Sequence, residues 1–308
     1  MPAALNDGKD FDPEGYGESV RNLYARYQDI CELFPEEIDD AALPYFADWL
    51  TEKVYFIEIV TETEQDAHKV FVSMNDRGLS LTSAEMLKGY LLSEVSDDKR
   101  REALNEEWKA KMLALKELGK NEEEDCIKTW LRAKYAESIR ENRKGAEPKD
   151  FDLIGISFHK WVRDEHTRLG LVSSEDFDAF IVEFCKFADL YIRIKHYERA
   201  FDEKQPYIYY NAALNVTLQA QLCLAPVRIE DLGDTIDRKL KLMSRFIDIY
   251  TYTRVTNYKS MDYSTIKYAV FQITKRVRDL GVKELADQLS KEVAELGISM
   301  RDAGATSV

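Results

Sequence analysis

Residues 71–88 read Phe71-Val-Ser-Met-Asn75-Asp-Arg77-Gly78-Leu-Ser-Leu81-Thr82-Ser-Ala-Glu85-Met-Leu-Lys88, a pattern that predicts a helix, a tight turn and a second helix. Apolar residues at helical spacing precede the turn. The run Asn75–Gly78 supplies the turn itself, since Asn, Asp and Gly tolerate backbone conformations that break a helix. Thr82 and Glu85 have the spacing of a capping box, in which each side chain binds the other residue's backbone amide. We therefore expect a helix-turn-helix over residues 64–95.

The same residues resemble the signature of the GmrSD-type restriction family, a family of phage-defence proteins. The matching positions are Phe71, Asn75, Asp76, Arg77, Gly78, Leu81 and Thr82, followed by Met86-Leu87-Lys88 and Tyr90-Leu91-Leu92. Members of this family carry an N-terminal ParB-like nuclease or nucleotide-handling domain, a long helical middle region and often a C-terminal HNH-type nuclease domain. The resemblance implies a chain that takes part in DNA restriction.

Amphipathic helical stripes dominate the rest of the chain and predict an all-α fold, a bundle-like assembly of many helices. The stripes cover residues 104–115, 127–139, 151–161, 177–197, 236–250, 266–277 and 285–296. Pro206 is expected to open one further helix, with Tyr210, Leu214 and Leu218 facing inward and Pro226 at its end. One short β-strand is expected at residues 54–60, where β-branched and aromatic side chains concentrate.

Four regions are expected along the chain. They are a flexible leader (1–17), a signature-bearing helical region with one strand (18–120), a helical bundle region (121–300) and a frayed tail (301–308). No proline- or serine-rich linker divides the helices, so we expect them to pack closely on one another.

Composition and charge narrow the class of protein. A chain of 308 residues can bury a sizeable core as one large domain or two smaller ones. Its net charge of −14 argues against a protein whose whole surface binds nucleic acid, although a local basic patch remains compatible with it. No apolar run approaches the ~20 residues of a membrane span, and no signal peptide opens the chain. The four cysteines are far apart and fit buried free thiols in the cytoplasm.

The polar residues of the signature have two interpretations, structural and functional. These residues are Asn75, Asp76, Arg77, Gly78 and Lys88. In the structural interpretation, Asn75 and Gly78 shape the turn and Arg77 binds nearby carbonyl oxygens. In the functional one, Arg77 and Lys88 face a phosphate of DNA or of a nucleotide, since a planar guanidinium holds phosphate oxygens in pairs.

A second candidate site is the basic stretch 254–283, which has seven Lys and Arg residues against two Asp residues. Its candidate nucleic-acid contacts are Lys259, Lys267, Lys275, Arg276 and Arg278. Interleaved tyrosines suit stacking on bases. The alternative is a solvated helix face with half-buried tyrosines. Residues 128–149 are a weaker candidate, because glutamates dilute their charge.

Recognisable catalytic and metal-binding motifs are missing from the sequence. No histidine follows His196, although an HNH-type nuclease needs a late one, and there is no phosphate loop, dinucleotide fingerprint or Cys/His cluster. We therefore expect no catalytic residue, metal ligand or cofactor in this chain. The resemblance implies a nucleotide and a divalent metal in domains that the chain lacks.

Together these observations predict the helical middle region of a GmrSD-type DNA restriction or phage-defence protein. It would act as a scaffold and interaction region for a nuclease or nucleotide-handling domain outside this chain. The expected partners are the N-terminal ParB-like domain, a C-terminal HNH-type domain, DNA and a second copy of the chain, with no membrane. Two alternatives stay open: a stand-alone protein-interaction domain, and an enzyme with an unrecognised carboxylate site.

Overall fold

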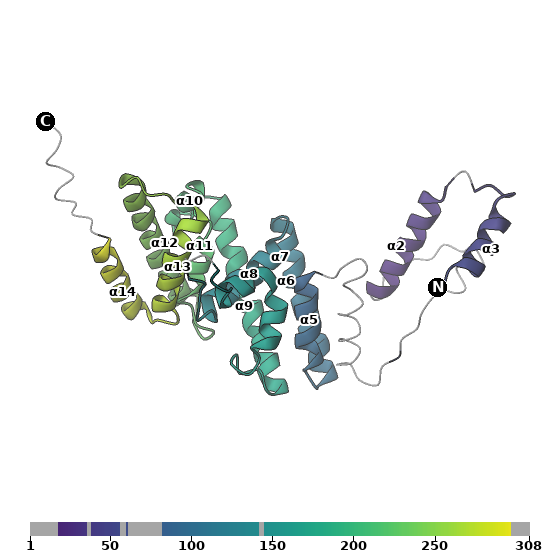
Figure 1. Cartoon of the computed structure of the whole chain (residues 1–308), viewed down its shortest axis with the longest axis horizontal. Helices are drawn as coiled ribbons and strands as arrows, with labels where there is room; N and C mark the ends of the chain where they lie inside the picture. The colour runs from purple at the N-terminus through teal and green to yellow at the C-terminus, as the bar shows by residue number, and fades with distance from the viewer. Residues whose placement is uncertain (1–17, 36–37, 56–59, 61–81, 142–144, 297–308) are drawn as a thin grey trace. The chain divides into compact units, whose positions relative to one another are not determined.

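The computed structural model describes residues 18–35, 38–55, 60, 82–141 and 145–296. All regular secondary structure in these residues is helical, which confirms the predicted mainly helical fold (Figure 1). The chain divides into two compact units, Met1–Val60 and Thr61–Val308, which we describe separately. None of the described helices combines the length and the apolar character needed to cross a lipid bilayer.

The first unit contributes two described helices, α2 (Glu18–Leu33) and α3 (Leu43–Lys53). Asp39 shapes the turn before α3, because its carboxylate accepts hydrogen bonds from the amides of Ala41 and Ala42 at 3.0 and 2.9 Å. None of the residues of α3 is buried. The apolar side chains of this helix therefore lie on the surface of the unit.

The β-strand predicted at residues 54–60 is not found. Val54 and Tyr55 have no strand structure, and residues 56–59 lie outside the described part of the chain. A strand needs a neighbour to pair its backbone amides and carbonyls, and the described residues contain no other strand to supply one. The preference of β-branched and aromatic residues for strands is context-dependent, and here it misled the prediction.

The second unit contributes ten described helices that share one hydrophobic core. They are α5 (Ser83–Ser93), α6 (Asp98–Leu118), α7 (Glu122–Lys134), α8 (Asp150–Asp164), α9 (Ser174–Arg199), α10 (Pro206–Ala213), α11 (Gln219–Leu224), α12 (Gly233–Thr256), α13 (Tyr263–Val277) and α14 (Val282–Glu295). Helix α9 packs against α6, α7, α10 and α11, while α12 packs against α10, α11 and α14 (Figure 1). We call α5–α14 the helical body.

Aromatic side chains fill the space between α6, α7 and α9. The ring centroid of Trp130 lies 4.7 Å from that of Phe180 and 5.3 Å from that of Phe184. Trp108 reaches the other side of Phe184, with the two centroids 4.3 Å apart. All four side chains are buried. Because large aromatic side chains bury more apolar area than any others, this cluster is a main packing contact of the helical body.

The single helix predicted between Pro206 and Pro226 is in fact two helices, α10 and α11. Between them Asn215 has a φ of 64°, in the left-handed region where a right-handed helix cannot continue. Of the three residues predicted to face inward, Leu218 is buried, whereas Tyr210 and Leu214 are 51% and 55% exposed. The break redirects the chain so that all six residues of α11 are buried.

Helix α5 joins the signature to the core of the helical body. Leu87 and Leu91 are fully buried, and α5 contacts α6, α7, α8 and α9. The ring of Tyr90 packs edge-on against Phe177 of α9, with centroids 5.7 Å apart. The helix that follows the signature turn is therefore built into the body.

We expect Leu91→Ala to lower the free energy of unfolding by about 2–5 kcal/mol, because it removes buried methyl groups and leaves a cavity. Leu113→Ala on α6 is the matched control: Leu113 is 63% exposed, so its truncation should change stability by less than ~0.5 kcal/mol. Urea denaturation measures both. Equal effects of the two substitutions would contradict the burial of α5.

Candidate functional site

The start of α5 has the predicted capping box. Thr82 Oγ1 accepts a hydrogen bond from the Glu85 amide at 3.2 Å, and Glu85 Oε2 accepts one from the Thr82 amide at 2.9 Å. The Thr82 hydroxyl also donates to the same carboxylate oxygen at 3.1 Å. These bonds fix the direction in which the chain enters α5.

Four of the five candidate residues of the signature lie outside the described residues. They are Asn75, Asp76, Arg77 and Gly78. The fifth, Lys88, is partly buried on α5. The structural and the functional interpretation of this turn therefore both stay predictions.

The cations near the end of α13 bind the end of α7. Lys275 Nζ lies 2.8 Å from a carboxylate oxygen of Glu137 and donates to the carbonyl of the same residue at 2.8 Å. Arg278 donates to the carbonyls of Ala133 and Ala136 at 2.9 and 2.7 Å and pairs with Glu137. The C-terminal end of a helix attracts cations because its carbonyls point outward.

The remaining candidates of the basic stretch differ in their surroundings. Arg276 holds both carboxylate oxygens of Glu292 on α14, at 2.5 and 2.7 Å, and these hydrogen bonds raise the pKa of Arg276. Lys267 Nζ lies 3.5 Å from Asp152, whereas Lys259 is exposed. Four of the five candidates thus have a carboxylate neighbour within the protein. Contact with nucleic acid by this stretch stays a prediction.

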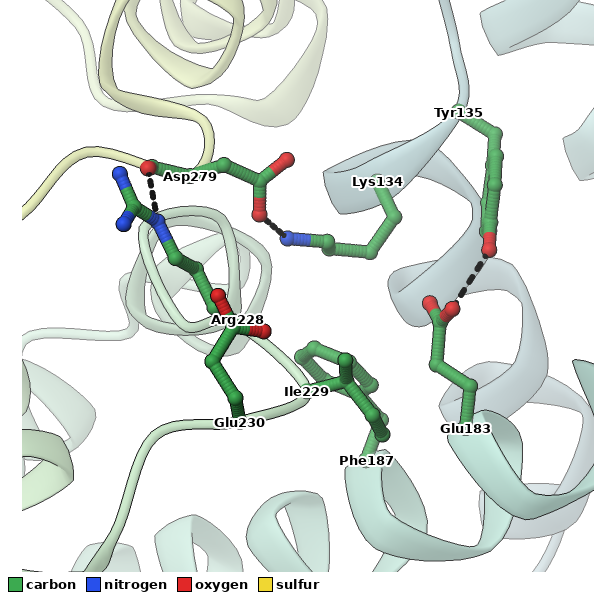
Figure 2. A pocket seen from close by; sticks show the side chains of 8 residues that line it. All are labelled: Lys134, Tyr135, Glu183, Phe187, Arg228, Ile229, Glu230 and Asp279. Carbon is green, nitrogen blue, oxygen red and sulfur yellow. Dashed lines mark hydrogen bonds and ion pairs between the residues drawn. The ribbon is translucent and has the colours of Figure 1, made fainter. Parts of the chain in front are cut away.

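A pocket of about 370 Å³ lies next to the contact between α7 and α13. Its lining residues are Lys134, Tyr135, Glu183, Phe187, Arg228, Ile229, Glu230 and Asp279 (Figure 2). The ammonium of Lys134 pairs with Asp279 and donates to the carbonyl of Val227 at 2.7 Å. Burial lowers the pKa of Lys134, and the hydrogen bond with Asp279 acts in the opposite direction.

A hydrogen-bonded carboxylate forms another wall of this pocket. Glu183 accepts a hydrogen bond from the Tyr135 hydroxyl at 2.9 Å (Figure 2). It accepts a second one from Trp130 Nε1 at 3.1 Å. Burial raises the pKa of Glu183, although both hydrogen bonds favour its charged form. Burial and the neighbouring Glu183 raise the pKa of Tyr135.

The interior groups of the pocket are held by one another, so the arrangement ties α7, α9 and the α13–α14 turn together. The sequence analysis missed them because no local pattern reveals these pairs: Glu183 lies 48 positions from Tyr135, and Asp279 lies 145 from Lys134. Within the described residues, no three His, Cys, Asp or Glu side chains gather as candidate metal ligands.

Comparison with known proteins supports the resemblance seen in the signature. Residues 4–92 match the family model described as GmrSD restriction endonuclease, N-terminal domain. No curated protein and no solved structure significantly matches the chain. The predicted family resemblance is confirmed over these residues. The match is to an N-terminal domain and includes the signature, whereas we expected the signature to belong to the helical middle region and the N-terminal domain to lie outside this chain. The scaffold role of the helices stays a prediction.

We expect Arg278→Ala to destabilise the protein by about 1.5–3 kcal/mol, because it removes charged hydrogen bonds to the end of α7. Arg245→Ala is the control, since Arg245 is exposed on α12, and it should have little effect. Urea denaturation of the two variants tests this. Retained stability together with weakened DNA binding would instead support the nucleic-acid interpretation of the basic stretch.

The raised pKa of Glu183 predicts that ionisation of this carboxyl destabilises the folded protein. Between its ordinary value of 4.5 and its raised value, the folded state binds the proton more tightly than the unfolded state, so stability falls as pH rises. Glu183→Gln cannot ionise and should lack this loss. The free energy of unfolding of the wild type, relative to Glu183→Gln, should therefore decrease as pH rises above about 4.5. Urea denaturation from pH 4 to 8 measures it, and a relative stability that increases with pH would contradict the prediction.

Proposed function

We propose, from the GmrSD match over residues 4–92, that the chain works in a DNA restriction protein of phage defence. In this proposal the helical body is a scaffold that holds the signature end of the matched domain in a fixed direction. The nuclease or nucleotide chemistry is carried out by residues outside the described helices or by other domains.

This proposal rests on one observation: α5 belongs both to the segment that matches the family and to the packed core of the helical body. The family match ends at residue 92, inside α5, while Leu87 and Leu91 of the same helix are fully buried in the helical body. The matched segment therefore ends inside the packing of the body, without a linker between them. The described part of the matched segment is thus a helix that begins at a capping box on Thr82 and Glu85 and packs into the helical body.

Arg77 is the residue through which we propose that the signature acts. It precedes the capped start of α5 by five positions, and the amides at a helix start favour negative charge near them. A phosphate of DNA or of a nucleotide suits both the guanidinium and this helix start. Lys88, further along α5, is proposed as a second cation for the same phosphate.

The partners follow from the family resemblance alone. We propose DNA as the target, with an HNH-type nuclease domain and a nucleotide and divalent metal handled outside the described residues. Association with a second copy of the chain is part of the same proposal. These partners would be identified by purifying the whole protein from cells that express it under phage challenge.

We expect Arg77→Ala to abolish restriction of phage in cells while the melting temperature of the purified protein stays unchanged. Removing the guanidinium takes away a phosphate contact without touching the described core. The plating efficiency of phage and thermal unfolding measure the two quantities.

Arg245→Ala again serves as the matched control, because it removes the same charge from an exposed site on α12. If Arg77 only ties down the turn, Arg77→Ala will lower the melting temperature and activity will fall in proportion to unfolding. That outcome, or full activity of Arg77→Ala, rejects the proposed role.

A further inference from the structure

A largely buried guanidinium lies where α7, α8 and α13 meet. Arg132 of α7 keeps only part of its surface open to solvent. Its Nε donates to the carbonyl of Phe151 at 3.0 Å, and its guanidinium carbon lies 4.2 Å from the centre of that residue's ring. Within the described ranges, no carboxylate forms an ion pair with it. Arg132 thus contacts a carbonyl and an aromatic ring, whereas a buried charge is usually paired with an ion of opposite charge.

Burying this charge is unfavourable. Burial lowers the pKa of Arg132, while Tyr263 and Asp152 act in the opposite direction. Buried cations are ordinarily paired with an anion, because leaving water is costly for an isolated charge. The chain has 57 acidic residues, yet the described structure pairs none of them with Arg132. Arg132 therefore has no ion-pair partner among the described residues, although Asp152 lies near enough to act on its charge.

Helix α8 is shaped to admit the guanidinium. A Cβ atom on Gly155 would lie 2.2 Å from Arg132 Nη2, so any other residue at this position would displace the guanidinium. Two residues later, Ser157 interrupts the helix with a φ of −156° and a ψ of 67°. The close approach of Arg132 to the backbone of α8 depends on this glycine.

Asp152 links the surroundings of Arg132 to a second cation, Lys267. Asp152, whose charge Arg132 senses, is already used by other groups: Oδ2 accepts the amides of Arg140 and Lys149 at 2.8 and 3.4 Å, and Oδ1 lies 3.5 Å from Lys267 Nζ. Arg140 and Lys149 are exposed. Asp152 thus holds the backbone at Arg140 and Lys149 and brings one further cationic side chain, that of Lys267, close to the surroundings of Arg132.

The same contacts join the two basic stretches that the sequence presents separately. Arg132, Arg140 and Lys149 belong to residues 128–149, and Lys267 belongs to residues 254–283. Exposed Glu141 and Glu147 oppose their charge in the adjoining segment. Lys267 is the cationic side chain that an ion pair places at Asp152, beside the buried Arg132, on a chain whose net charge is −14.

We propose that Arg132, Tyr263 and Lys267 bind a phosphate group of the DNA backbone. The guanidinium fork matches two phosphate oxygens, and the bound phosphate supplies the ion-pair partner that Arg132 lacks among the described residues. Tyr263 acts against the effect of burial on the pKa of Arg132 and is 41% exposed, so it lies at the edge of the site. Such a contact positions DNA without reading its sequence. This inference rests on the proposed function in DNA restriction.

The test uses the purified whole chain, a fluorescent duplex oligonucleotide and the variant Arg132→Met. Methionine keeps an unbranched apolar side chain but removes the charge, so the melting temperature without DNA should stay equal or rise. DNA affinity should fall about tenfold or more, and the slope of log K against log salt should decrease by about one. Arg245→Met on α12 is the control that removes an exposed charge.

Gly155→Ala gives a second variant that changes no charge. Its added Cβ should displace the guanidinium and weaken DNA binding in the same direction as Arg132→Met. If Arg132→Met lowers the melting temperature and leaves DNA affinity unchanged, Arg132 is structural and the proposal is overturned. A loss of affinity for ATP or inorganic phosphate with unchanged DNA affinity also overturns it, because the anion would then be a free phosphate compound.

The outcomes separate this inference from the proposed function. If the wild type binds duplex DNA and Arg132→Met binds it equally well, the phosphate site is rejected and the proposed function stands. If the wild type binds no DNA at all, both the DNA target and the phosphate site are rejected.

Discussion

Three lysine ammonium groups hold the segment between α11 and α12, and the second unit depends on this contact. The segment, residues 225–232, makes no regular helix, so its buried carbonyls need donors from elsewhere. Lys134 of α7 donates to Val227 at 2.7 Å, and Lys186 of α9 donates to Asp231 at 2.9 Å. Lys239 of α12, 1% exposed, donates to Pro226 at 2.8 Å. Three helices thereby meet on one irregular segment.

Helix α7 shows two ways of burying a cation, two residues apart. Lys134 is surrounded by acceptors, among them the carbonyl of Val227 and the carboxylate of Asp279, and these compensate its charge within the protein. Arg132 has one carbonyl and an aromatic ring. The first arrangement is sufficient for packing, because every partner is internal. The second leaves Arg132 without an ion pair among the described residues, and this is the observation on which the proposed phosphate site rests.

Local patterns in the sequence predicted local structure well. The capping box of Thr82 and Glu85 formed as expected because both partners lie within one helical turn. The break at Asn215 was missed, since a left-handed residue there is favoured only once α11 is buried among helices from distant parts of the chain. The strand at residues 54–60 was expected from side-chain preference alone, which cannot supply a pairing partner.

Counting charges located the basic stretch but could not reveal what its members bind. Lys275 and Arg278 meet Glu137 across 138 and 141 positions of sequence, and Arg276 meets Glu292 on another helix. Arg132 was passed over for the converse reason: its special property is a missing ion pair, which no sequence displays. A cation that is paired within the folded protein is less available to a ligand than one without such a pair, and only the tertiary structure distinguishes the two.

Helix α5 also bears on how proteins of this kind can be recombined. The family match ends at residue 92, whereas the hydrophobic core continues through Leu87 and Leu91. A gene fusion made at the edge of the match would cut through packed side chains: one product would expose an apolar stripe, and the other would lose a wall of its core. The segment that matches the family model therefore does not coincide with a segment that folds as one unit. If the matched domain were exchanged between two such proteins, each hydrophobic core would stay intact only if α5 were kept with the helical body against which it packs.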